Sequence, residues 1–186
     1  MLALTRKAAI PFLLLAVSLV VFPFRALAQV NSNVGNVTLS ASVQDSISVS
    51  PAVGTVNFAL LPGAAVTGTP TVPITTSWNL KPAGGPTVSL YAYFDSSTAA
   101  LTDGTDNIPS ADVLGSVNSG AFTALTSTGP FGAAGASLLL FTEVIGGANK
   151  IKTRSDNLDV RIDLTGLPSL PAGTYTGTMR IQAQAL

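Results

Sequence analysis

The chain of 186 residues contains no cysteine, no histidine and a single glutamate, Glu143. Without cysteine no disulfide can form, so an exported domain of this sequence depends on its hydrophobic core. Without His and Cys, the side chains that most often act as nucleophiles, general bases and zinc ligands are missing. Most of the nine acidic residues lie in turn-like segments or on exposed strand faces, which disfavours catalysis by a carboxylate pair. The sequence therefore predicts a non-catalytic protein without a metal or cofactor.

The first 28 residues have the organisation of a secretory signal peptide. Arg6 and Lys7 precede an apolar run over 8–24, and a small-x-small cleavage motif ends at Ala28. An uncleaved membrane anchor is the alternative, but the apolar run is short for a spanning helix. We therefore predict a signal peptide over 1–28 and a mature chain that is secreted or on the cell surface, in the periplasm or outside, without a membrane span.

Charge is also scarce in the mature chain. Cleavage after Ala28 leaves six basic and nine acidic residues, a net charge of about −3. No basic patch of the kind that binds nucleic acid is apparent, so we expect no nucleic-acid partner.

Apolar and polar residues alternate with period two through much of the mature chain, which is typical of half-buried antiparallel strands. The expected strands cover 37–43, 47–49, 56–60, 72–80, 88–94, 112–117, 122–125, 137–145, 150–154, 158–164 and 174–185. A strong turn signal at 81–86 predicts that 71–94 forms a hairpin. The run 137–145 is largely apolar, so we expect a strand that is buried on both faces.

These strands, with frequent turn signals and no helical pattern after the signal peptide, predict an all-β protein. We expect one antiparallel β-sandwich domain of about eight strands over 29–186, with an excursion rich in Ser, Gly and Ala at 95–136. The expected core consists of Phe58, Trp78, Leu90, Leu140, Ile162, Tyr175, Met179 and Ile181.

Two neighbouring tyrosines are the best candidate ligand-binding residues. Tyr91 and Tyr93 lie on the face of their strand opposite to the apolar residues. Exposed aromatic rings in this arrangement can stack on a sugar or on a partner protein. The alternative is that both rings pack under the 95–136 excursion.

Charged clusters offer weaker signals. Residues 103–107 contain oxygen ligands suited to calcium, but the full twelve-residue loop pattern is absent, which favours a polar turn. Lys150, Lys152 and Arg154 share one side of an expected strand. They are candidates for contact with an anionic partner, or they form the charged side of an edge strand that discourages edge-to-edge pairing.

The stretch LPAGTYTGT at 170–178 resembles the late strand of bacterial pilin-type subunits and spore coat protein U-like secreted proteins. This resemblance implies an immunoglobulin-like sandwich in which Gly173 and Tyr175 form a structural corner, as the tyrosine corner does in immunoglobulin domains. It also implies a structural, pilus- or coat-like assembly subunit. The alternative function is a surface adhesin or carbohydrate-binding module that uses Tyr91 and Tyr93 on a polysaccharide.

The expected strand 174–185 leaves an open edge, because no further strand follows it in the sequence. An open edge is a template for strand addition. It can be covered by the chain's own segment 37–43, or by the N-terminal segment of another copy or another surface protein. Residues 29–36 contain only Val30 and Val34 as large apolar residues, which favours self-closure.

Overall fold

The computed structural model describes residues 33–82 and 84–186. The predicted signal peptide lies outside these residues. The chain divides into two units, Met1–Ala41 and Ser42–Leu186. Of the first unit, only 33–41 are described, and they contain no strand and no buried residue. The second unit carries all the described strands and is called the domain below.

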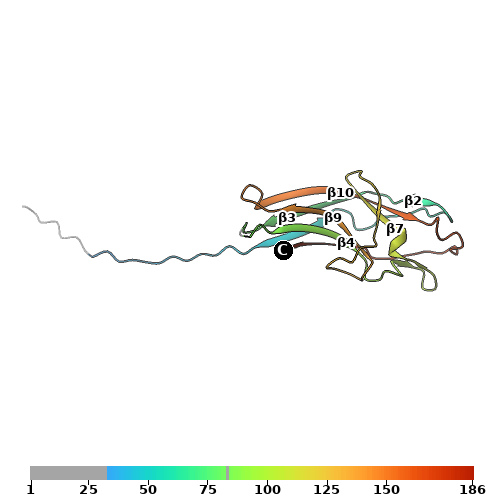
Figure 1. Cartoon of the computed structure of the whole chain (residues 1–186), viewed down its shortest axis with the longest axis horizontal. Helices are drawn as coiled ribbons and strands as arrows, with labels where there is room; N and C mark the ends of the chain where they lie inside the picture. The colour runs from blue at the N-terminus through green and yellow to red at the C-terminus, as the bar shows by residue number, and fades with distance from the viewer. Residues whose placement is uncertain (1–32, 83) are drawn as a thin grey trace, which may run out of the picture. The chain divides into compact units, whose positions relative to one another are not determined.

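The domain contains a larger and a smaller antiparallel sheet, whose long strands run along a common direction (Figure 1). The larger sheet has the order β1 (Ser46–Pro51), β3 (Val72–Asn79), β10 (Ile151–Asp163), β7 (Val113–Val117), β8 (Thr123–Ala124), and β2 (Ala65–Thr67) also pairs with β10. The smaller sheet has the order β11 (Arg180–Ala185), β4 (Thr87–Tyr93), β9 (Ser137–Val144). The excursion adds the pair β5 (Leu101–Thr102) and β6 (Asn107–Ile108) and the 3-10 turn η1 (Ser110–Asp112).

One hydrophobic core joins the two sheets. The period-two pattern turns Ile74 and Trp78 of β3 and Ile162 of β10 towards Leu90 of β4 and Phe141 of β9, and all five side chains are buried. Each large apolar side chain buried in this way contributes about 1.5–3 kcal/mol. Trp78 also satisfies its only polar atom, because its Nε1 donates to the carbonyl oxygen of Asn149 at 2.9 Å. The predicted all-β class is therefore confirmed.

The predicted hairpin over 71–94 is wrong. β3 belongs to the larger sheet and β4 to the smaller one, so the turn between them crosses from one sheet to the other. Both strands carry an apolar face that requires cover. Placing them in opposite sheets lets the two faces cover each other, which a hairpin within one sheet does not.

The predicted strand over 37–43 is also wrong. These residues pair with no other described strand, and Val37, Leu39 and Val43 are exposed. The first strand among the described residues is β1, which begins at Ser46. Similarly, residues 56–60 form only an isolated bridge, Asn57 with Thr69, in place of the expected strand. Alternation in sequence makes a strand possible, but the strand forms only where a neighbouring edge supplies hydrogen bonds.

In the excursion and in the strand after it, the observed strands lie close to the predicted ones. The expected short strands at 112–117 and 122–125 correspond to β7 and β8, and β9 occupies most of 137–145. The expected burial of both faces of β9 is wrong, because Leu139 is 45% exposed. β9 is the edge of the smaller sheet, and its register shifts opposite Leu90 and Tyr91, so its apolar run is not evenly covered.

Of the expected core residues, Trp78, Leu90 and Ile162 are buried. The others are only partly buried and pack at the margin of the core: Phe58, Leu140, Tyr175, Met179 and Ile181. All of these except Leu140 line one open groove.

Candidate functional site

The groove is an open cavity of about 740 Å³ on one side of the domain. One wall is the stretch 51–60, which continues from β1, and the other is the stretch 173–181, which leads into β11. Its floor consists of apolar side chains from the larger sheet, from the residue that follows β4 and from the excursion: Val72, Phe94, Leu101, Val113, Val160 and Ile162. A smaller cavity of about 190 Å³ adjoins it, and the two share Leu60, Gly173 and Tyr175.

Both walls of the groove present unpaired backbone groups. Thr176 exchanges two backbone hydrogen bonds with Thr102, which directs the N–H and C=O of its neighbour Gly177 to the opposite side. In the same way Asn57 exchanges two bonds with Thr69, which turns the backbone of Phe58 away from that pair. Among the described residues, the backbone groups of Gly177 and Phe58 find no backbone partner. The groove therefore has the hydrogen-bonding edges that an added strand requires.

Two glycines make these walls possible. A side chain on Gly177 would collide with the carbonyl oxygen of Ala100, so only glycine lets this wall approach β5 closely enough for the Thr176 bridge. A side chain on Gly68 would collide with Val56 and Phe58 of the other wall. Neither glycine was predicted from the sequence to have this role. Their only signal was isolation within stretches of small residues, which is shared by many glycines of this chain.

Tyr175 and Gly173, the predicted structural corner, lie at one end of the groove. The Tyr175 hydroxyl donates to the carbonyl oxygen of Pro171 at 3.0 Å, four residues upstream, as in a tyrosine corner. Desolvation, assisted by the charge of Asp103, raises the pKa of Tyr175, so the phenol stays protonated and can donate this bond. The ring is only half-buried, because the groove leaves one side uncovered.

Tyr91 and Tyr93, the predicted ligand-binding residues, both contact Phe131 of the excursion. The Tyr91 and Phe131 rings meet edge to face with centroids 5.9 Å apart, and Tyr93 stacks on Phe131 at 5.8 Å. The Tyr93 hydroxyl also donates to Oε1 of Gln182 at 2.9 Å. This is the packing arrangement that the sequence analysis gave as the alternative to ligand binding. Phe131 itself was missed, although it is an isolated aromatic residue in a segment of small residues.

The cations at the start of β10 are held by acidic residues of the same chain. Lys152 Nζ lies 2.7 Å from Glu143 Oε1 of β9, and Arg154 Nε lies 2.7 Å from Oδ2 of Asp156. The Arg154 guanidinium also lies 4.2 Å from the ring centroid of Phe141. Along this half of β10 the described residues supply a strand partner on one side only, β3. This agrees with the charged-edge interpretation.

The Glu143 carboxylate is the centre of this cluster. The hydrogen bond from Lys152 lowers the pKa of Glu143, and Asn149 adds a second bond. Burial raises the pKa of Asp156, but hydrogen bonds from Arg154 and Asn118 outweigh it, so the pKa of Asp156 lies below its usual value. Both carboxylates are therefore ionised at neutral pH.

The acidic loop at 103–107 is a polar turn. Oδ1 of Asp103 accepts bonds from the backbone N–H groups of Asp106 and Thr105, and these bonds lower the pKa of Asp103. Across the described ranges, no group of three or more acidic side chains is arranged to hold a metal ion. No helix within those ranges is long and apolar enough to span a membrane.

The groove with its two backbone edges is therefore the candidate site. Comparisons of the chain with protein-family models, with curated proteins and with solved structures find no match.

Proposed function

We propose that this chain is a non-catalytic structural subunit that assembles by strand addition. In this proposal the groove of one copy accepts residues 37–43 of a second copy, so that copies join head to tail. The observation that carries the proposal is the groove itself, which combines an apolar floor with unpaired backbone groups on both walls.

The strand order supports an immunoglobulin-like topology with one position open. The series β1-β3-β10-β7 corresponds to strands A, B, E and D of an immunoglobulin domain. The series β11-β4-β9 has the neighbours of strands F, C and C′, although β9 follows β7 in the chain, whereas C′ precedes D in an immunoglobulin domain. No described strand lies in the place of strand G, next to β11. An added strand in the groove would lie beside the stretch 173–181 that leads into β11 and would extend the smaller sheet there.

The segment 37–43 has the properties of such a strand. Val37, Leu39, Ala41 and Val43 alternate with small polar residues, and all of them are exposed. Seven residues of strand span about 23 Å, and the wall 173–181 spans about 30 Å, so the segment fits within the groove. Each of its three large apolar side chains would gain about 1.5–3 kcal/mol on burial.

Chain geometry favours a second copy over self-closure. The groove begins at Pro51, the last residue of β1, whereas Val43 precedes the first residue of β1 by three positions. A chain that turned back at 44–45 would have to run about 20 Å along β1 before it reached the groove. The apolar residues of 37–43 would then lie beside β1, where β1 and β11 already meet.

The predicted signal peptide over 1–28 leads us to place this assembly outside the cytoplasm. The proposal therefore includes export to the periplasm or the cell surface. Polysaccharide binding by Tyr91 and Tyr93 stays a prediction, and their packing against Phe131 does not favour it.

The test compares the chain from residue 29 with a double variant, Val37→Ser and Leu39→Ser. We expect the unmodified chain to form filaments or high-mass polymers by electron microscopy and light scattering. The variant should stay monomeric, because its segment no longer supplies apolar side chains. A synthetic peptide of residues 35–45 should bind the monomeric variant and raise its melting temperature.

The matched control changes the alternate, polar face of the same segment, Thr38→Ser and Ser40→Thr. This variant should polymerise like the unmodified chain. The proposal is overturned if the unmodified chain remains monomeric at high concentration and the peptide does not bind to the apolar-face variant.

A further inference from the structure

We propose that successive copies also make a direct end-to-end contact. This inference rests on the strand addition proposed above. We call the surface formed by Asp45, Lys81 and Lys150 the root surface. In this contact the root surface of one copy lies against one end of the groove of the next copy, at Asp103 and Asp106. The partner is a second copy of this chain, and the contact lies outside the groove.

The root surface is held rigidly at the point where the segment leaves the domain. Oδ1 of Asp45 accepts a hydrogen bond from the backbone N–H of Lys81 at 2.9 Å. The backbone N–H of Leu80, one residue earlier, donates to the carbonyl oxygen of Lys150 at 2.8 Å. These bonds place both lysines next to Asp45, immediately before β1.

The connection between the segment and the root surface is very short. Only Gln44 separates Val43, the last apolar residue of the segment, from Asp45. Two residue steps of extended chain cover about 7 Å at most. When Val43 lies in the groove of a second copy, Asp45 of its own domain must therefore lie close to one end of that groove.

The direction of the added strand decides which end this is. β11 pairs antiparallel with β4, and antiparallel pairs outnumber parallel ones, so we expect the added strand to run antiparallel to 173–181. Its C-terminal residue, Val43, then lies near Tyr175, and the root surface lies near Gly173. The opposite end of the groove lies where β1 and β11 come together.

Carboxylates stand at that groove end. Oδ2 of Asp103 lies so close to Gly173 that a Cβ there would come within 2.8 Å of it. The backbone bonds from Asp106 and Thr105 lower the pKa of Asp103, so this carboxylate is charged at neutral pH. Within the part of the chain that the structure describes, neither Asp103 nor Asp106 forms an ion pair.

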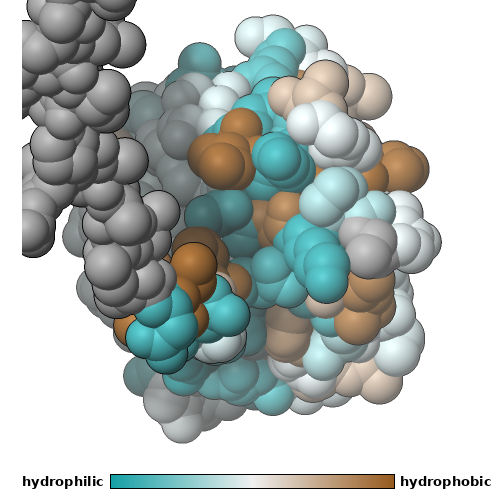
Figure 2. Space-filling model, turned by 90° about the vertical axis from the view of Figure 1, so that its left-hand side faces the viewer, coloured by the Kyte–Doolittle hydropathy of each residue, from teal (hydrophilic) through white to brown (hydrophobic). Residues whose placement is uncertain are grey.

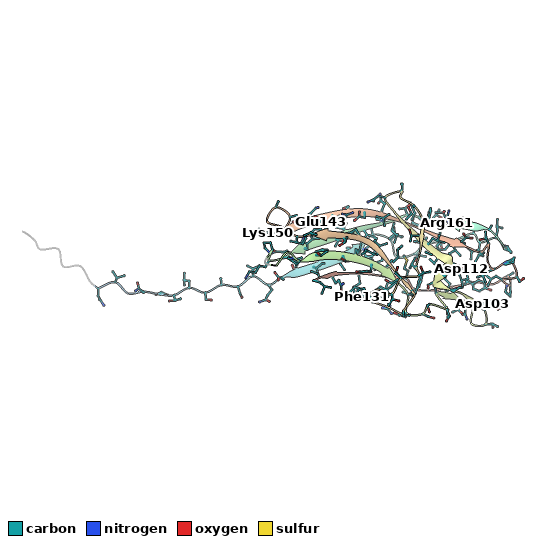
Figure 3. All side chains as sticks on the ribbon, viewed as in Figure 1. Asp103, Asp112, Phe131, Glu143, Lys150 and Arg161 are labelled. Carbon is teal, nitrogen blue, oxygen red and sulfur yellow. The ribbon has the colours of Figure 1, made fainter. Side chains whose placement is uncertain are left out.

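The root surface carries the opposite charge. The side chains of Lys81 and Lys150 are exposed and form no ion pair with any described residue. Asp45 offsets one of the two positive charges, so the surface keeps an excess of positive charge. Figure 3 shows Lys150 and Asp103 at opposite ends of the domain, as head-to-tail contact requires.

The root end also exposes three apolar side chains at the ends of β9, β10 and β11: Val144, Ile151 and Leu186. Figure 2, which faces this end, shows polar and apolar residues interspersed on the coloured surface. Complementary charges across such a contact steer encounter and raise the association rate more than the final affinity. The end contact should therefore act mainly on the rate of assembly.

The experiment measures polymerisation rates by light scattering at low and high salt. One variant of the chain from residue 29 carries Lys81→Glu and Lys150→Glu. A second carries Asp103→Asn, which keeps acceptors for the turn, and Asp106→Lys. At low salt each variant should polymerise about 10-fold more slowly, the combined variant should recover most of the rate, and the differences should shrink at high salt.

The control removes the charges of an ion pair outside both surfaces, Glu143→Gln with Lys152→Gln, and should leave the rate unchanged. Polymerisation at the same rate in all variants, or no recovery in the combined variant, overturns the end contact alone. An unmodified chain that does not polymerise overturns the strand addition and the end contact together. Binding of the 35–45 peptide, which lacks both lysines of the root surface, should not change in the Lys81→Glu, Lys150→Glu variant.

Discussion

The two sides of the domain where the sheets face each other are built differently. On the side of β9 and β10, Glu143 of the smaller sheet binds Lys152 of the larger one at 2.7 Å, and Arg154 covers the ring of Phe141. On the groove side, the walls 51–60 and 173–181 leave apolar side chains and backbone groups uncovered.

The β9–β10 side and the groove side therefore show two different arrangements at an open edge of a sheet. Charged side chains that are partly exposed close an edge without inviting another strand, because a strand that pairs there would have to desolvate them. Uncharged walls with free backbone groups do the reverse and invite strand addition. Among the described residues, no charged side chain lines the groove.

Replacing a phenylalanine by alanine on each of the two sides should change the free energy of unfolding most, and by unequal amounts. Phe141→Ala on the β9–β10 side removes a buried ring and should lower the free energy of unfolding by about 3–5 kcal/mol. Phe58→Ala removes a half-buried ring from the groove wall and should cost about 1–2 kcal/mol in the monomer. Both values are measured by urea denaturation, with each substitution made in the monomeric Val37→Ser, Leu39→Ser variant. Equal losses would mean that the groove side is as well covered as the other.

A smaller effect is expected where the groove wall approaches β5. Gly177→Ala would press its methyl group against the carbonyl oxygen of Ala100, so the wall must shift, at a cost of about 1–3 kcal/mol. Gly54→Ala on the opposite wall is the control, because nothing lies within 4 Å of its added Cβ. Thermal unfolding of the two variants compares them. A loss of similar size at Gly54 would contradict the close approach proposed for Gly177.

The smallest effect is expected at the ion pairs. The pKa of Glu143 is lowered in the folded chain, so its contribution is present above its unfolded pKa and is lost as the pH falls through the folded value. Glu143→Gln should therefore cost about 1 kcal/mol at pH 7, and the difference from the unmodified chain should vanish in acid. Denaturation at pH 7 and pH 3 measures this. A difference that persists at pH 3 would show that Glu143 acts through packing.

The sequence by itself determined the local features. Period-two alternation identified the all-β class and the inward residues of β3, β4 and the second half of β10, because this pattern depends only on which face meets water. The resemblance of 170–178 led to the expected corner at Gly173 and Tyr175, and the bond from Tyr175 to Pro171 lies within five consecutive residues. Charges at alternate positions also indicated the edge character of the first half of β10.

Only the tertiary structure decided which strands are neighbours. The turn at 81–86 reads like a hairpin turn, yet it crosses between the sheets, because the apolar faces of β3 and β4 cover each other across the core. The segment 37–43 has the alternation of a strand but no described partner, and the walls of the groove have edges but no described strand between them. Strand formation needs both an alternating pattern and a free edge in reach, and the second condition is a property of the whole fold.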